Sequence, residues 1–257
     1  PTANQLNSSI FNGTTFAPKA ENNWFWLAKL TYKYSPTLKF YYSFNQSVNI
    51  NQNSQSLQSN LEYIEPSPGY QYNFQNILDN ANTFTHNNKY HSLGITHTLN
   101  SKMFYEFKIN SFYTNLRADA NGNDYSMYND PKDIVTFPIE YYNINRDTIG
   151  VIPGDGFWDV GNPYTWRDHY VEEFSVRGDL TNFFDEKNKF KAGFNFQFQE
   201  MQVIDIYKPW VGELGLNNDM YKVYPALGSL YAQDNINFSG MILNFGLRLD
   251  YWFPGKY

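Results

Sequence analysis

The sequence predicts an all-β protein, and more specifically a segment of an antiparallel transmembrane β-barrel. Three observations support this prediction: strand-length stretches that alternate between apolar and polar residues, connections that alternate between short and long, and an aromatic-rich composition without any long apolar run. The clearest alternation places five side chains on one face of a strand and leaves Lys191, Asn195 and Gln197 on the other. The five are Phe190, Ala192, Phe194, Phe196 and Phe198.

Composition excludes several classes of protein. The 257 residues include 22 Tyr, 22 Phe and 6 Trp, too many aromatic side chains for a disordered chain. No run approaches the roughly 18 apolar residues of a spanning helix, which excludes a helical membrane protein. The net charge is -6 and Lys and Arg do not cluster, so no nucleic-acid partner is expected. The chain has no Cys, which excludes disulfides and thiol catalysis.

The first half of the chain holds four of the eight strands that the alternation predicts. Strand 24–34 is followed by the turn Ser35-Pro36-Thr37 and by strand 38–48. A polar stretch over 49–88 then leads to strands 90–99 and 102–115, which flank a turn at Asn100-Ser101. Each strand carries Leu, Ile, Phe or Tyr at alternate positions, as a half-apolar strand requires.

The second half holds the other four strands. After a long segment over 118–167, we expect strand 169–181, a turn over 182–188, and strand 189–206. A third long connection over 207–225 precedes strands 227–236 and 241–252, which are joined by a turn at 237–240. The last strand alternates Met241, Leu243, Phe245, Leu247 and Leu249 with polar residues.

The lengths of the connections argue for an outer-membrane barrel. Structureless loops of about 40 to 50 residues are uncommon inside a compact soluble domain. Outer-membrane barrels pair short periplasmic turns with long extracellular loops, which is the pattern found here. The chain enters the first strand and leaves the eighth on the long-loop side, whereas complete barrels keep both termini in the periplasm. We therefore expect these eight strands to belong to a larger barrel.

Two segments near the end of the chain resemble the barrel of TonB-dependent outer-membrane receptors. One is Tyr231-Ala232-Gln233-Asp234, and the other is Gly246-Leu247-Arg248-Leu249-Asp250-Tyr251 after a short turn. The hairpin over 171–201 also looks like that family, and the bias toward Asn, Tyr and Phe is similar to receptors of Bacteroidetes-type bacteria. The resemblance is specific over about 168–253 and only architectural before that.

The resemblance implies a 22-stranded barrel filled by an N-terminal plug domain. It also implies bacterial outer-membrane lipid and the TonB system as partners, and TonB-dependent uptake of a scarce nutrient, which would be a small molecule, oligosaccharide or peptide. The plug domain is expected to lie outside this chain, which we treat as one barrel portion over 1–257. The resemblance implies a receptor and transporter rather than an enzyme, and no cofactor.

Candidate ligand-binding residues lie in the long loops. Aromatic side chains mixed with polar donors are typical of sites that capture sugars or siderophores. An ordered loop packed by its own aromatic residues would show the same composition. The candidates are Asp155, Trp158, Tyr164, Trp166, Arg167 and Trp210.

Four charged residues are expected to face the lumen of the barrel. Arg177, Asp179, Arg248 and Asp250 alternate with apolar neighbours, and they would either line a substrate path or form ion pairs that order a wet interior. No metal site is expected, because the four His are not at ligand spacing. No catalytic residue is expected, because adjacent residues of a strand face opposite sides, so Asp168 cannot orient His169.

Two alternatives stay open. One is a small self-contained eight-stranded outer-membrane barrel with an adhesive or structural role. The other is a soluble β-sandwich that binds polysaccharide, which would be soluble without detergent. The substrate is not identified by the sequence.

Overall fold

The computed structural model describes residues 21–52, 72–134, 139–142, 148–152, 154 and 156–255. Nine strands form one antiparallel sheet, and their bounds extend the predicted strands at most ends. They are β1 (Glu21–Lys33), β2 (Leu38–Asn51), β3 (Asn82–Asn100), β4 (Met103–Ala120), β7 (Thr165–Phe183), β8 (Asn188–Tyr207), β9 (Asn217–Val223), β10 (Ala226–Phe238) and β11 (Met241–Phe253).

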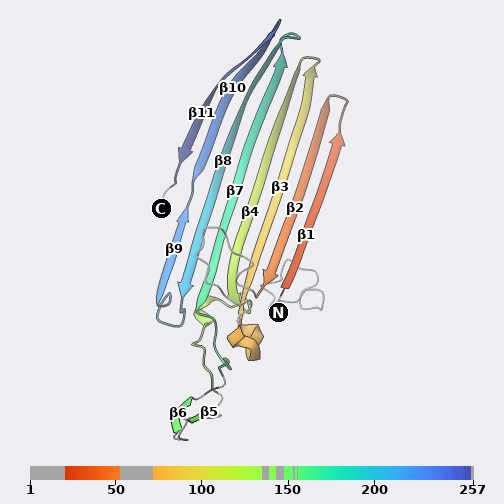
Figure 1. Ribbon diagram of the computed structural model, residues 1–257. Helices are drawn as coiled ribbons and strands as arrows, with labels where there is room; N and C mark the ends of the chain where they lie inside the picture. The colour runs from red at the N-terminus through yellow and green to blue at the C-terminus, as the bar shows by residue number, and fades with distance from the viewer. Residues whose placement is uncertain are drawn as a thin grey trace.

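The smaller elements lie in the long connections. A 3-10 helix, η1 (Tyr72–Asn80), precedes β3, and a single turn, η2 (Tyr125–Met127), follows β4. Strands β5 (Ile139–Tyr142) and β6 (Thr148–Ile152) pair only with each other, as a ribbon beyond one end of the large sheet (Figure 1). Neither described helix is long and apolar enough to cross a membrane.

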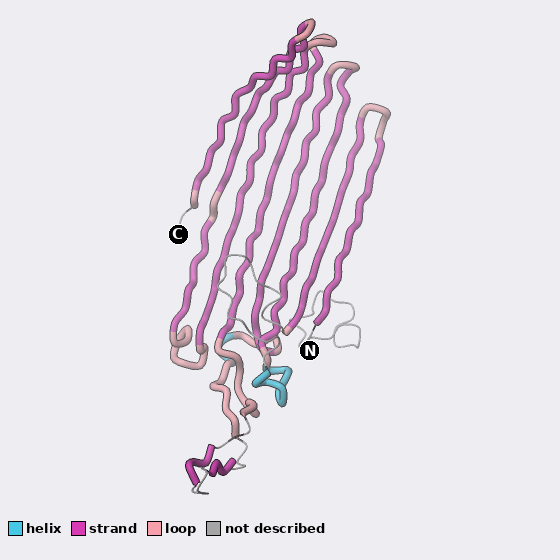
Figure 2. The backbone as a smooth tube through the Cα atoms, in the orientation of Figure 1, coloured by secondary structure: helices cyan, strands magenta, loops and turns pink. Residues whose placement is uncertain are grey.

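The sheet is a single layer in which successive strands lie side by side. The order along its main path is β1-β2-β3-β4-β7-β8-β10-β11, and every pairing is antiparallel. Figure 2 shows the tight turns gathered at one end of the strands and the long connections at the other. We call these the turn end and the loop end. The all-β, antiparallel prediction is confirmed, and within the described residues the sheet is open, with β1 and β11 at its edges.

One expected connection is wrong in part. Residues 207–225 were expected to be loop, but β9 occupies Asn217–Val223 and pairs with the loop-end half of β8, from Met201 to Tyr207. Strand β10 pairs with the other half of β8. Strands β9 and β10 therefore lie end to end along β8. Pro225 separates them because it has no N–H for the ladder. Its carbonyl still accepts a hydrogen bond from the Gln199 N–H at 2.9 Å.

The strand register joins the apolar positions into one continuous face. Residues directly opposite one another lie on the same side of a sheet, so one row can be followed strand by strand from β1 to β11. That row runs Leu30, Tyr42, Leu93, Ile109, Val176, Phe196, Gly228 and Tyr251. We call this side of the sheet the apolar face. The apolar faces inferred separately from the sequence therefore agree with one another, apart from strand 227–236, whose alternation is too weak to assign its faces from the sequence.

The opposite side of the sheet carries mainly polar and charged side chains, with apolar exceptions on the edge strands such as Leu27 and Ile242, and we call it the polar face. One of its rows runs Lys33, Lys39, Thr96, Glu106, Asp179, Gly193, Tyr231 and Arg248. Nearer the middle of this face, the Ser92 hydroxyl and the Ser175 hydroxyl both bond to the Asn110 side chain, at 2.7 and 3.1 Å.

The strands are longer than the apolar stretch that they carry. On β8 the apolar face is unbroken from Phe190 to Phe198, about 27 Å at the usual rise per residue. Beyond it the same face becomes polar, with Glu172 directly opposite Glu200 and Lys222 paired to Glu200 at 2.5 Å. Strand β7 begins at Thr165, so Glu172 is well inside a strand and not at its end.

Candidate ligand-binding site

A small hydrophobic core lies at the loop end, where β4 and β8 end and β7 begins. It contains Ala120, Tyr128, Trp166 and Ile206, and Trp166 is directly opposite Ile206 in the register. The Trp166 side chain is only 4% exposed, its indole N–H donates to the Asn123 carbonyl at 3.1 Å, and Arg117 lies over its ring. Trp166 therefore packs the loop end together and presents almost no surface to a ligand.

The turn after β4 closes over this core. The Tyr128 hydroxyl accepts a hydrogen bond from the buried Ala120 N–H at 2.7 Å, and burial raises the pKa of this hydroxyl well above its ordinary value. Asp119 is 2% exposed, and its carboxylate accepts from the Arg117 side chain at 2.5 Å and from the Gly122 N–H at 2.8 Å. Asp119 thus orders the turn.

Two predicted residues, Tyr164 and Trp210, meet above this core. The register explains why: Thr165 opens β7 and Tyr207 closes β8, and the two are directly paired, so the segments flanking them come together. The ring centroids of Tyr164 and Trp210 are 5.7 Å apart, and the ring of Tyr207 is 6.2 Å from that of Tyr164. We call Tyr164, Tyr207, Trp210 and Lys208 the aromatic platform.

Lys208 gives the aromatic platform a positive charge. Its ammonium group lies 5.4 Å from the ring centroid of Tyr164 and 5.6 Å from that of Tyr207, within cation–π range. Its backbone N–H donates to the Tyr164 carbonyl at 2.5 Å, which ties the two segments together. Tyr164 and Tyr207 are 42% and 38% exposed, so their rings are accessible. Tyr207 and Lys208 were not predicted, although they lie just before Trp210 in the sequence.

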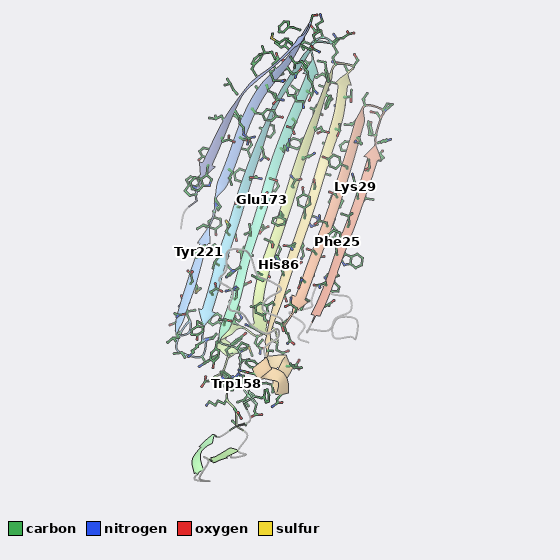
Figure 3. The ribbon with its side chains drawn as sticks, viewed as in Figure 1. Phe25, Lys29, His86, Trp158, Glu173 and Tyr221 are labelled. Atoms are coloured by element: carbon green, nitrogen blue, oxygen red, sulfur yellow. The ribbon has the colours of Figure 1, made fainter. Side chains whose placement is uncertain are left out.

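The remaining loop candidates do not join this cluster. Trp158 belongs to a separate part of the loop end, where its N–H donates to the Asn73 carbonyl of η1 at 2.7 Å (Figure 3). Asp155 lies outside the described residues. The structure therefore divides the predicted loop site into an exposed aromatic platform, a buried Trp166 and a Trp158 that contacts η1 instead.

Arg167 lies on the other face of β7 from Trp166. Its Nε is 2.6 Å from Oδ1 of Asp205, and the other carboxylate oxygen of Asp205 is 3.0 Å from Nε2 of His169. Asp168 points the opposite way and accepts a hydrogen bond from Asn115 at 2.8 Å. His169 is thus contacted by a cross-strand carboxylate rather than by its sequence neighbour.

The four charged residues expected to face a lumen all lie on the polar face. Arg177 pairs with Asp179 on the same strand, with Nε and Oδ2 2.7 Å apart. Arg248 pairs with Asp250 in the same way, at 2.8 Å. These bonds occupy both carboxylates, as expected of pairs that order a polar surface.

No group of three or more His, Asp or Glu residues in the described part of the chain is placed to hold a metal ion. Comparison of the sequence with protein-family models finds no matching family, and comparison with curated proteins finds no significant match. The functional argument therefore rests on the geometry described above and on the sequence resemblance over about 168–253.

Proposed function

We propose that this chain is part of the wall of a bacterial outer-membrane β-barrel of the TonB-dependent receptor class, which binds a nutrient at its extracellular loops and imports it. The observation that carries the proposal is the apolar face. It continues across eight strands without a covering layer among the described residues, and Leu30, Leu93, Leu230 and Leu249 are all largely exposed on it.

The size of this face favours lipid as its environment. Eight strands about 4.8 Å apart and about 27 Å of apolar strand length give an area on the order of 900 Å². Soluble monomers rarely expose an apolar patch larger than a few hundred Å². The apolar length also suits the band of about 25 Å that outer-membrane barrels present to lipid. In this orientation the polar face lines the interior and the loop end is extracellular.

The aromatic platform supplies a ligand site on the extracellular side. Exposed aromatic rings stack on the apolar faces of sugar rings or of chelating groups, while Lys208 offers a charged donor for hydroxyl or carboxylate oxygens. The class identity and the dependence on TonB rest on the sequence resemblance over about 168–253.

The mass and solubility of the native protein test this proposal. We expect extraction from outer membranes only with detergent, at a mass several times the 30.2 kDa of this chain, as a plugged receptor requires. A detergent-dependent protein near 30.2 kDa would instead support a small self-contained barrel. That alternative has one structural argument, since the edge strands β1 and β11 run in opposite directions and so could pair. Solubility without detergent would overturn both outer-membrane hypotheses, the plugged receptor and the small barrel, and would support the soluble β-sandwich.

A further inference from the structure

We infer that Asp234 and an adjoining groove on the apolar face bind one phospholipid whose headgroup carries a primary ammonium group. Within the described strands, Asp234 is the one Asp, Glu, Lys or Arg side chain on the turn-end half of the apolar face. A charge among lipid-facing apolar side chains is costly and generally marks a functional site. The inference rests on the proposed function only in that the apolar face meets lipid.

Asp234 has no positively charged partner in the described part of the chain. It takes part in none of the ion pairs there, and its Oδ1 atom is buried without a hydrogen-bond donor. Oδ1 of Asn188 is buried and unpartnered in the same way, and Asn188 faces Ile236, the next residue of β10 on this side. Buried oxygens are stable when a donor reaches them. An ammonium group supplies both the charge and several N–H donors.

Aromatic rings flank Asp234 on both sides. The strand register places Phe190 of β8 and Phe245 of β11 directly opposite it. A third ring, that of Phe184 in the turn before β8, lies 6.2 Å from the ring of Phe190. Aromatic faces attract cations and also pack against the methylene groups that carry an amine. A carboxylate between such rings therefore suits an alkylammonium group better than a hydrated metal ion.

An apolar groove of about 630 Å³ lies beside this carboxylate, between β4, β7, β8 and β10. Ala192 lines it and leaves space because its side chain is small. The ring of Phe194 leans over Gly178 on the neighbouring strand, where a Cβ would stand 2.5 Å from it. Leu230 also lines the groove, about 13 Å from Asp234 along β10. The groove therefore runs from the carboxylate toward the middle of the sheet.

The order of these features matches a lipid with its headgroup at the turn end. Asp234 lies opposite Phe190, where the apolar stretch of β8 begins, and the groove lies farther from the turns. Lys102 Nζ donates to the Phe184 carbonyl at 3.1 Å, which places a positive charge near the same turn for the lipid phosphate. A wholly apolar occupant would fill the groove but leave the Asp234 carboxylate without a cation.

Lipid binding to the native protein in detergent tests the inference, since added lipid reaches an outward-facing surface. Native mass spectrometry compares phosphatidylethanolamine, phosphatidylcholine and phosphatidylglycerol with identical acyl chains. We expect phosphatidylethanolamine to bind about tenfold more tightly than the other two, because a quaternary ammonium donates no hydrogen bond and a glycerol headgroup has no positive charge.

Three variants separate the headgroup site from the groove. Asp234→Asn should remove the preference for phosphatidylethanolamine. Asp185→Asn takes the same charge from the turn before β8 and should keep the preference. Ala192→Leu fills the groove and should weaken the binding of all three lipids without changing their order. Equal binding of the three lipids by the parent would overturn the inference, as would an Asp234→Asn protein that keeps the preference.

Membrane fractionation, combined with binding of the water-soluble dihexanoyl phosphatidylethanolamine, separates this inference from the proposed function. A protein that is soluble without detergent but binds this lipid through Asp234 would retain the site and refute the receptor. An outer-membrane protein that shows no headgroup preference would retain the receptor and refute the site.

Discussion

Tyr231 lies across Gly193 on the neighbouring strand and donates a hydrogen bond from its hydroxyl to Oδ1 of Asp179, two strands away, at 2.5 Å. Gly193 makes this possible because it has no side chain. A Cβ there would stand 2.7 Å from the Tyr231 ring and 2.6 Å from the Gly178 carbonyl oxygen. The contact fixes the relative positions of β7, β8 and β10 and holds the Arg177–Asp179 pair in place.

This geometry predicts a graded series of stability losses. Tyr231→Phe keeps the ring over Gly193 and loses one hydrogen bond, about 1 kcal/mol of the free energy of unfolding. Gly193→Ala should cost more, about 1–3 kcal/mol, because the methyl group meets backbone that cannot rotate away. Urea unfolding in detergent measures both. A Gly193→Ala protein as stable as the parent would show that the strands are not this close.

Adjacent residues of β8 should differ sharply in their tolerance of arginine. Phe196 lies on the apolar face and Gln197 on the polar face. If the apolar face meets lipid, Phe196→Arg should cost about 2–4 kcal/mol and lower the amount of assembled protein in the membrane fraction. Gln197→Arg should assemble normally. Phe196→Leu is the packing control, and equal tolerance at both positions would exclude the membrane assignment.

The strands could be predicted from the sequence because most of them alternate clearly on their own, as the Phe190 to Phe198 stretch does, whereas strand 227–236 alternates only weakly. The missed strand, β9, has no such pattern: Asn217, Asn218 and Asp219 suit a loop, and the segment is held by pairing with β8. The predicted third strand began too late for the same reason, since Phe84 is the one apolar side chain in 82–89. Local alternation therefore locates strands with one apolar face and misses strand ends that extend beyond it.

The sequence could predict which residues of the candidate site meet only where the pairing of β7 with β8 brings them together. Tyr164 and Trp210 flank the paired ends of β7 and β8, so their meeting follows from that pairing. The burial of Trp166 does not, because it depends on how the turn after β4 folds back to place Tyr125 and Tyr128 against it. No local pattern encodes that fold, and so composition alone placed Trp166 among the ligand residues.

Removing one hydroxyl should loosen the loop end. In Tyr128→Phe the buried Ala120 N–H loses its acceptor, which should cost about 1–3 kcal/mol. Hydrogen exchange should show faster exchange at Ala120 and at the neighbouring end of β4, with the turn end unchanged. Tyr125→Phe is the matched control, since that ring packs edge-on against Trp166 and its hydroxyl has no hydrogen-bond partner among the described residues. Similar exchange in the two variants would rule out this role for the Tyr128 hydroxyl.

The aromatic platform and the core beneath it should respond differently to the loss of a tryptophan or tyrosine ring. Tyr164→Ala and Trp210→Ala remove rings that are exposed or half-buried, so they should weaken ligand capture while the protein still assembles. Trp166→Ala empties a buried position and should destabilise the loop end by about 3–5 kcal/mol. Nutrient uptake by cells, normalised to the protein present in the membrane, separates the two effects. After normalisation, uptake should fall for the Tyr164 and Trp210 variants, whereas Trp166→Ala should act mainly through the amount of protein. Unchanged uptake in a Tyr164→Ala/Trp210→Ala protein would remove the aromatic platform from the binding site and direct attention to Trp158 beside η1.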